Sequence, residues 1–216
     1  MSGYPLIIFD WDGTLMDSKD RITECMQAAI RDVGAAPRSA AEIHNIIGLG
    51  LHESMQTLFP DNPEIWTAVI AAYRDHFLDE QRVDSEMFAG VDELLRELHA
   101  RGRLLAVATS KARRGLDRVL GQTGLGAYFH ATRCADEARS KPHPDMLQHI
   151  LTALGHDAED AVMVGDTEYD LRMAQAIGMD SIAVSYGVHE RQRLLACQPR
   201  HCVDDVASLA TILLGE

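Results

Sequence analysis

Near its start the chain carries an uninterrupted apolar run, Leu6 to Phe9, that stops at two aspartates on alternate positions, Asp10 and Asp12. Four large apolar residues in a row predict a strand that is buried on both faces, as in a parallel sheet covered by helices. In open α/β sheets, ligands bind just beyond the carboxyl ends of the strands. The two carboxylates are therefore expected where such a sheet holds its ligand.

Strand and helix patterns alternate through the second part of the chain, from residue 85 onward. Apolar runs of strand length follow segments of helical spacing that end at glycine. This alternation predicts a parallel sheet with helices on both faces. The expected strands are residues 104–108, 161–164, 181–184 and 201–203, and the expected helices are residues 91–101, 113–123, 145–154, 169–177 and 206–214.

The segment between the first strand and this alternating part carries helical patterns only. Helices are expected at residues 21–33, 40–47, 51–58 and 63–81, with no strand pattern between them. The sequence therefore predicts an α/β fold in which a Rossmann-like parallel sheet core is interrupted once by an inserted all-helical cap domain. The expected core domain is residues 1–16 and 85–216, and the expected cap domain is residues 17–84.

Composition and charge narrow the class of protein. Apolar residues make up 46% of the 216 positions and charged residues 25%, as in ordinary globular proteins. The formal net charge of −13 disfavours nucleic acid and anionic membranes as partners. No apolar run approaches the roughly 18 residues of a membrane span, and no basic leader precedes one, so we expect a cytoplasmic protein. The oligomeric state, monomer or dimer, is left open.

The four cysteines, Cys25, Cys134, Cys197 and Cys202, show no metal-site spacing. They form no Cys-x-x-Cys pair and no Cys/His cluster. We therefore expect them to be thiols in a reducing compartment, mostly buried as small apolar residues.

The pattern Asp-x-Asp-Gly-Thr at residues 10–14 has two readings that involve no catalysis. Asp and Gly favour solvated turns for conformational reasons, and alternating acids also open calcium loops. A calcium loop is excluded by position, because the sixth place from Asp10 is Leu15 rather than glycine and the twelfth is Arg21 rather than glutamate. The full pattern arises by chance in only about one chain in a thousand, and here it follows a buried strand.

Three further segments place polar side chains at the same expected edge of the sheet. Thr109 and Ser110 follow a strand and could bind phosphate or cap the next helix. Asp166 and Asp170 follow another strand and share one face of a first helical turn, where acids also occur for dipole reasons. Lys141 alone would be an ordinary surface lysine. Together these groups suit Mg²⁺ with a phosphate and predict phosphoryl transfer.

In this order, the four segments resemble the signatures of the haloacid dehalogenase-like hydrolases. The matching segments are residues 9–15, Thr109, Lys141 with Pro142, and Gly165-Asp166 with Asp170. The resemblance covers essentially the whole chain, including the helical insert, and the likeness is greatest to phosphoglycolate-phosphatase-like members. One departure is Ala89 before Gly90, where many relatives carry proline. It affects the return from the cap and not the chemistry.

This resemblance implies a phosphatase mechanism. Asp10 would be the nucleophile that forms an aspartyl-phosphate intermediate, and Asp12 would protonate the leaving alcohol and then activate water. Thr109, Ser110 and Lys141 would bind the phosphoryl oxygens and stabilise the charge of the transition state. The chain would then be a phosphoric monoester hydrolase acting on a small phosphorylated metabolite, with phosphoglycolate as one candidate.

Mg²⁺ is the cofactor that the resemblance implies. In the family, the metal is bound by the side chain of Asp10, the backbone carbonyl of Asp12 and Asp166, while Asp170 orients coordinated water or Lys141. The cation would screen the repulsion between the attacking carboxylate and the phosphate.

Other activities of the same fold stay open as alternatives. A dehalogenase needs no second acid, and relatives of that type lack the equivalent of Asp12. A sugar phosphomutase shares Asp10 and Asp12, although its fourth signature usually differs from the one present here. A catalytically idle module that binds phosphate or a protein is the third alternative, because fold alone does not determine function.

The cap would set specificity through a loop at residues 45–52 that closes over the site. We expect Gly48, Leu49 and His52 to contact the substrate, although glycines also end helices and histidines also lie on surfaces. Residues 43–55 contain no Lys or Arg. This absence disfavours a strongly anionic leaving group unless an arginine from elsewhere in the cap folds in.

Overall fold

The strand at Leu6–Phe9 (β1) lies inside a six-stranded sheet in the computed structural model, which describes residues 3–78 and 85–215. The pairings in this sheet are parallel, and the order is β5, β4, β1, β6, β7, β8. Asp10 therefore follows a central strand at its carboxyl end. The other strands are β4 (Leu104–Ala108), β5 (Ala131–Arg133), β6 (Ala161–Gly165), β7 (Asp180–Val184) and β8 (His201–Val203).

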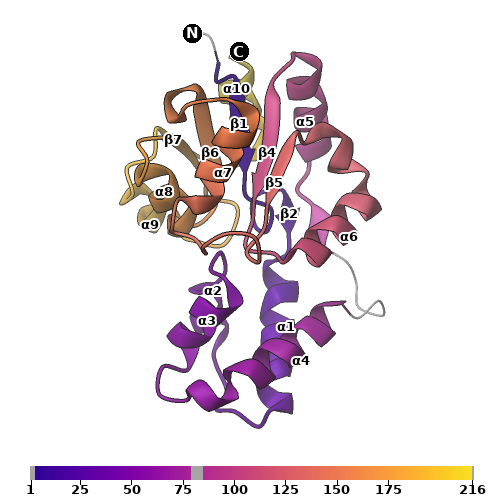
Figure 1. The fold of residues 1–216 in the computed structure, drawn as a ribbon, viewed down its shortest axis with the longest axis vertical. Coiled ribbons are helices and arrows are strands. Elements are labelled where there is room, and N and C mark those ends of the chain that lie inside the picture. The colour runs from indigo at the N-terminus through magenta and orange to yellow at the C-terminus, as the bar shows by residue number, and fades with distance from the viewer. Residues whose placement is uncertain (1–2, 79–84, 216) are drawn as a thin grey trace.

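Helices cover both faces of the sheet (Figure 1). Alternate residues of β1 enter two separate apolar clusters, because side chains alternate across a strand. Ile7 and Phe9 pack with helices α5 (Val91–Ala100), α6 (Arg113–Thr123) and α10 (Val206–Leu214). Leu6 and Ile8 pack with α7 (Asp145–Leu154) and α8 (Glu168–Gln175) on the other face. The burial of β1 on both faces is as its apolar run predicts.

The helices inserted after β1 form a group of their own, the cap helices, at one end of the molecule, with both chain ends at the opposite end (Figure 1). They enclose a separate apolar cluster that includes Met26, Ile43, Met55 and Val69. The cap helices are α1 (Lys19–Asp32), α2 (Ala40–His44), α3 (Leu51–Leu58) and α4 (Trp66–Leu78), with a 3₁₀ turn at Pro63–Ile65.

A short antiparallel pair marks where the chain leaves the sheet and returns to it. β2 (Met16–Asp17) pairs with β3 (Glu86–Met87), and the N–H of Phe88 donates to the carbonyl of Leu15 at 3.2 Å. We propose on this basis that residues 1–16 with 85–216 and residues 17–84 are two domains. The end of the helix expected at 63–81 and the domain boundary at 84 lie outside the described residues.

Most of the expected elements are present, several with the same bounds. The strand at Leu104–Ala108 and the helices at Leu51–Leu58, Arg113–Thr123 and Asp145–Leu154 match the sequence analysis. The helix expected at 40–47 is shorter and ends at His44, and the first residues of the helix expected at 63–81 form a 3₁₀ turn. The sequence analysis missed β2, β3, β5 and α9 (Arg191–Leu195).

Within the described residues, no helix combines the length and apolar character needed to cross a membrane. The same part of the chain shows no disulfide between its four cysteines, and Cys25 and Cys134 are buried. The cysteines therefore occur as the thiols that their spacing predicts.

The packing of the cap helices predicts the cost of opening a cavity there. Ile43 has no exposed surface and is a buried member of the cap cluster. Replacing it in the variant Ile43→Ala should lower the free energy of unfolding by about 2–5 kcal/mol, measured by urea denaturation. The matched variant Ile65→Ala, at a half-buried edge of the same cluster, should cost less. Equal costs for the two variants would contradict the packing described here.

Candidate active site

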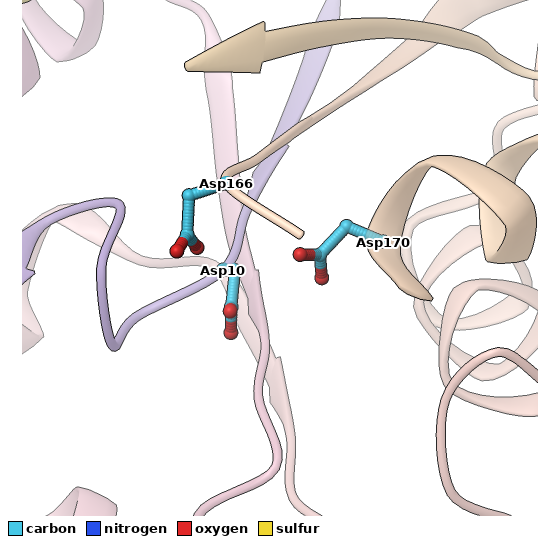
Figure 2. A group of neighbouring side chains, drawn as sticks. All are labelled: Asp10, Asp166 and Asp170. Atoms are coloured by element: carbon cyan, nitrogen blue, oxygen red, sulfur yellow. The ribbon is translucent and has the colours of Figure 1, made fainter. Parts of the chain in front are cut away.

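Three carboxylates from separate segments meet at the carboxyl edge of the sheet (Figure 2). Asp10 follows β1, Asp166 follows β6, and Asp170 lies in the first turn of α8. One oxygen of each lies within 4.8 Å of the others, and all three residues are buried. Because Phe9 pairs with Val164 in parallel register, the two strands end side by side and bring their acids to the same place.

A buried lysine joins two of these acids. Lys141 Nζ lies 2.7 Å from Asp10 Oδ1 and 2.6 Å from Asp170 Oδ1, and the lysine has no exposed surface. The second oxygen of Asp170 accepts from the N–H of Thr167 at 3.1 Å and from its hydroxyl at 2.7 Å. Both oxygens of Asp170 are thus used within the protein, and this residue holds Lys141 in place.

The charges of this cluster do not balance. Burial raises the pKa of Asp10 to about 7, against the lowering effect of Lys141 and with a further rise from the charge of Asp170. Burial likewise raises the pKa of Asp166 well above its ordinary value. Burial alone would lower the pKa of Lys141, but the carboxylates of Asp10 and Asp170 outweigh it and raise that pKa. When ionised, the three acids outnumber the one ammonium group, and the raised pKa values of Asp10 and Asp166 mean that this excess negative charge is costly without a further cation.

The oxygens of Asp166 and Asp10 keep room for a further ligand. Asp166 accepts one hydrogen bond on each oxygen, from the hydroxyl of Thr14 at 3.0 Å and from the N–H of Val188 at 2.9 Å. Asp10 Oδ1 is buried and lies 2.7 Å from the ammonium group of Lys141. The oxygens of this buried cluster and its excess negative charge fit a divalent cation with oxygen ligands.

Glycines allow the backbone to approach two of these acids closely. A Cβ on Gly13, whose φ is +81°, would lie 2.1 Å from Asp166 Oδ2, and a Cβ on Gly187 would lie 2.4 Å from Asp166 Cβ. A Cβ on Gly165 would lie 2.4 Å from Asp170 Cβ. The positions of both acids therefore require glycine on the segments that surround them.

Asp12 lies beside this cluster in a different setting. Its side chain is 15% exposed, and its Oδ1 accepts from the hydroxyl of Ser18 at 2.7 Å and lies 2.9 Å from Lys111 Nζ. The ammonium group of Lys111 also lies 4.5 Å from the centre of the Phe77 ring on α4. The sequence analysis did not single out Lys111, although its place two residues after Thr109 was a usable signal.

Thr109 and Ser110 follow β4, the strand beside β1. Thr109 is fully buried, and its hydroxyl accepts from the N–H of Lys111 at 3.2 Å. The hydroxyl of Ser110 donates to the carbonyl of Gly48 in the cap. Thr109 is thus placed at the acid-bearing edge, while Ser110 is placed where that edge meets the cap.

The loop at residues 45–50 rests against the sheet edge. The hydroxyl of Tyr169 donates to the carbonyl of Asn45 at 2.6 Å, and the N–H of Gly50 donates to the hydroxyl of Ser140 at 2.7 Å. Arg193 Nη1 donates to Asn45 Oδ1 at 2.8 Å. The sequence analysis missed Ser140, Tyr169 and Arg193, because isolated polar residues in separate segments give no signal of a shared contact.

A cavity of about 470 Å³ lies between the cap helices and the sheet edge. Asp10 and Asp12 line it from the core, and Gly48 and Leu49 line it from the cap loop. His52 is not among its lining residues. The ring of His52 instead contacts the ring of Trp66 edge-on at 5.0 Å. Of the three cap residues expected at the substrate, the structure brings two to the cavity.

Comparison with known proteins agrees with this geometry. A family model described as haloacid dehalogenase-like hydrolase matches residues 7–184. The probable phosphatase IndB of Dickeya dadantii is 37% identical over 93% of this chain and 89% of its own length. A phosphoglycolate phosphatase of Vibrio cholerae is 30% identical over 99% of both chains. The crystal structure of a predicted phosphatase from Clostridium acetobutylicum superposes with a TM-score of 0.89, with 28% identity and full coverage of both chains.

Four motifs, the strands that carry them and the inserted helices all lie within this match across residues 7–184. The resemblance found in the sequence is confirmed. The chain belongs to the haloacid dehalogenase-like hydrolases.

Proposed function

We propose that the chain is a phosphatase that hydrolyses phosphomonoesters of small metabolites through a phosphorylated Asp10. One observation carries this function. The buried carboxylate of Asp10 is held by Lys141 at 2.7 Å beside the carboxylates of Asp166 and Asp170, and it lines a cavity that Asp12 also lines. Two of the relatives, the one from Dickeya dadantii and the one from Vibrio cholerae, are phosphatases by name, which supports the same reaction. The likeness to the phosphoglycolate phosphatase makes phosphoglycolate one candidate substrate.

In the first step, a carboxylate oxygen of Asp10 attacks the phosphorus atom and the bond from phosphorus to the ester oxygen breaks. Asp12 gives its proton to the departing alkoxide, which leaves as an alcohol. In the second step, Asp12 takes a proton from a water molecule. The oxygen of that water attacks the phosphorus atom bound to Asp10. Inorganic phosphate leaves, and Asp10 returns to its carboxylate form.

The surroundings of the two acids support these separate roles. Asp10 is buried and held by Lys141, so its position is fixed for attack in line with the ester bond. Asp12 is more exposed and is held by Ser18 and Lys111, so it can exchange protons with the cavity. Thr109 at the end of β4 and the ammonium group of Lys141 are placed to compensate charge on the phosphoryl oxygens.

Mg²⁺ fits the donors at this site. Asp10 and Asp166 would hold it through their side chains, with the backbone carbonyl of Asp12 as a third ligand and Asp170 in an outer position through Lys141. Mg²⁺ supplies positive charge that screens the carboxylate from the phosphate and polarises the phosphoryl group. We also propose that the protein is located in the cytoplasm, in keeping with the thiol state of the cysteines.

The nucleophile assignment predicts the effect of one substitution. The variant Asp10→Asn should lower kcat for p-nitrophenyl phosphate by at least about a thousandfold, because an amide cannot form the acyl phosphate. The matched variant Asp61→Asn, at an exposed position in the cap, should keep the activity. Full activity in Asp10→Asn would exclude the mechanism.

The same assay, with a panel of sugar phosphates, separates the alternatives. Free phosphate as product indicates a phosphatase, and an isomerised sugar phosphate indicates a mutase. A folded protein that binds Mg²⁺ but turns over no phosphoester would favour the idle module.

The packing around Asp166 predicts how Mg²⁺ binding responds to added side chains. Mg²⁺ should raise the melting temperature of the unmodified protein, because the ion binds the folded state only. The variant Gly13→Ala should weaken this rise, since its Cβ would displace Asp166. Gly34→Ala is the matched control, because its φ of +71° imposes similar backbone strain, of about 1–2 kcal/mol, with no atom within 4 Å of the new Cβ. Equal Mg²⁺ responses in the two variants would contradict the proposed metal site.

A further inference from the structure

The cavity over the reacting acids has two unlike walls. The core wall carries Asp10, Asp12 and Lys111, which are charged. The cap wall is largely apolar, with Ser54, Arg74 and Asp75 as polar members, and comes mainly from two helices and the loop between α2 and α3. Its members include Ile22 and Met26 on α1, Ile47 and Leu49 in the loop, and Tyr73 and Phe77 on α4.

Helical spacing explains why the cap wall is continuous. Ile22 and Met26 are four residues apart on α1, and Tyr73 and Phe77 are four residues apart on α4, so each pair lies on one helix face. The rings of Tyr73 and Phe77 lie 5.6 Å apart. The loop closes the wall because Gly48, with a φ of +100°, approaches the core so closely that a Cβ would lie 2.8 Å from Thr167 Oγ1.

Cations in this cavity are either paired or on its rim. Among the described lining residues, the cations are Lys111, Arg74 and Arg114. Lys111 pairs with Asp12 at 2.9 Å and packs over Phe77. Arg74 and Arg114 also line the cavity, with exposed side chains. A carboxylate placed against the apolar members of the cap wall would lose its water, which is costly unless one of these exposed cations compensates its charge.

Of the three side-chain hydroxyls among the described lining residues, two lie at backbone carbonyls and the third belongs to Tyr73. The hydroxyl of Ser110 donates to Gly48, and the hydroxyl of Ser54 lies 3.5 Å from the carbonyl of Ile46. A leaving group rich in hydroxyls would bury polar groups against apolar side chains. An apolar leaving group would instead gain free energy from each buried methylene.

We propose that the preferred substrate is a phosphomonoester whose leaving group is uncharged and largely apolar or aromatic, bound against the cap wall. The volume of the cavity lies within the range of ordinary small-molecule pockets. This inference rests on the proposed phosphatase function and specifies its substrate class. It also argues against phosphoglycolate, whose leaving group carries a carboxylate.

A series of straight-chain alkyl phosphates tests the proposal, because methyl, butyl and hexyl phosphate share one ester chemistry and differ in apolar length. We expect kcat/KM to rise along the series by up to about fourfold per methylene. The leaving group of isobutyl phosphate has the shape of that of phosphoglycolate but no charge. Its kcat/KM should exceed that of phosphoglycolate by about tenfold or more.

A pair of leucine variants tests where the alkyl chain binds. Leu49→Ala shortens the cap wall and should lower the ratio of kcat/KM for hexyl over methyl phosphate by about tenfold. This ratio is independent of any misfolded fraction. Leu195→Ala, at a leucine that is 49% exposed, should leave the ratio unchanged.

The outcomes distinguish failure of this inference from failure of the proposed phosphatase function. A flat or falling alkyl series, or faster turnover of phosphoglycolate than of isobutyl phosphate, would overturn the inference and leave the phosphatase function standing. An unchanged ratio in Leu49→Ala would also overturn it. No release of phosphate from the series, from phosphoglycolate or from p-nitrophenyl phosphate would instead contradict the phosphatase function itself.

Discussion

The site depends on one buried ammonium group. Lys141 is fully buried, and its Nζ joins Asp10 at the end of β1 to Asp170 on α8. Lysine is almost never fully buried without acids that compensate its charge. Here the two acids that pair with the lysine lie together with a third, Asp166. The lysine fixes the direction of two carboxylates, and the negative charge that it leaves uncompensated is what suits the cluster to a divalent cation and then to a phosphate.

The sequence was enough to predict the parts of this arrangement that follow from strand register. An apolar run such as Leu6–Phe9 reports a strand buried on both faces, and parallel strands bring the residues after them to one edge. The three-residue strand Ala131–Arg133 was missed because it is only partly buried and carries no apolar run. The contact of Lys111 with Asp12 was also missed, although both residues follow neighbouring strands of the core and Lys111 lies two residues after Thr109.

The two parts of the chain carry different constraints. In the core, the backbone at Gly13 and Gly187 packs so closely against Asp166 that neither position has space for a Cβ, so this acid has little freedom to move. In the cap, apolar side chains such as Leu49 and Phe77 line the same cavity, so a substitution there changes mainly the size of the space for the leaving group. The proposed reacting groups therefore lie in the core and the side chains that would select the leaving group lie in the cap, so the two sets can be varied independently. Substitutions in the cap wall should change which ester is cleaved while the reacting groups stay in place.

Covalent trapping tests the phosphorylation of Asp10 most directly. Protein mixed with p-nitrophenyl phosphate and Mg²⁺ is quenched during turnover and treated with borohydride, which reduces an acyl phosphate to an alcohol. Peptide mass analysis then identifies the reduced residue. We predict that Asp10 is converted to homoserine and that Asp12, Asp166 and Asp170 are unchanged. Reduction at another residue, or steady turnover with no residue reduced, would contradict Asp10 as the nucleophile.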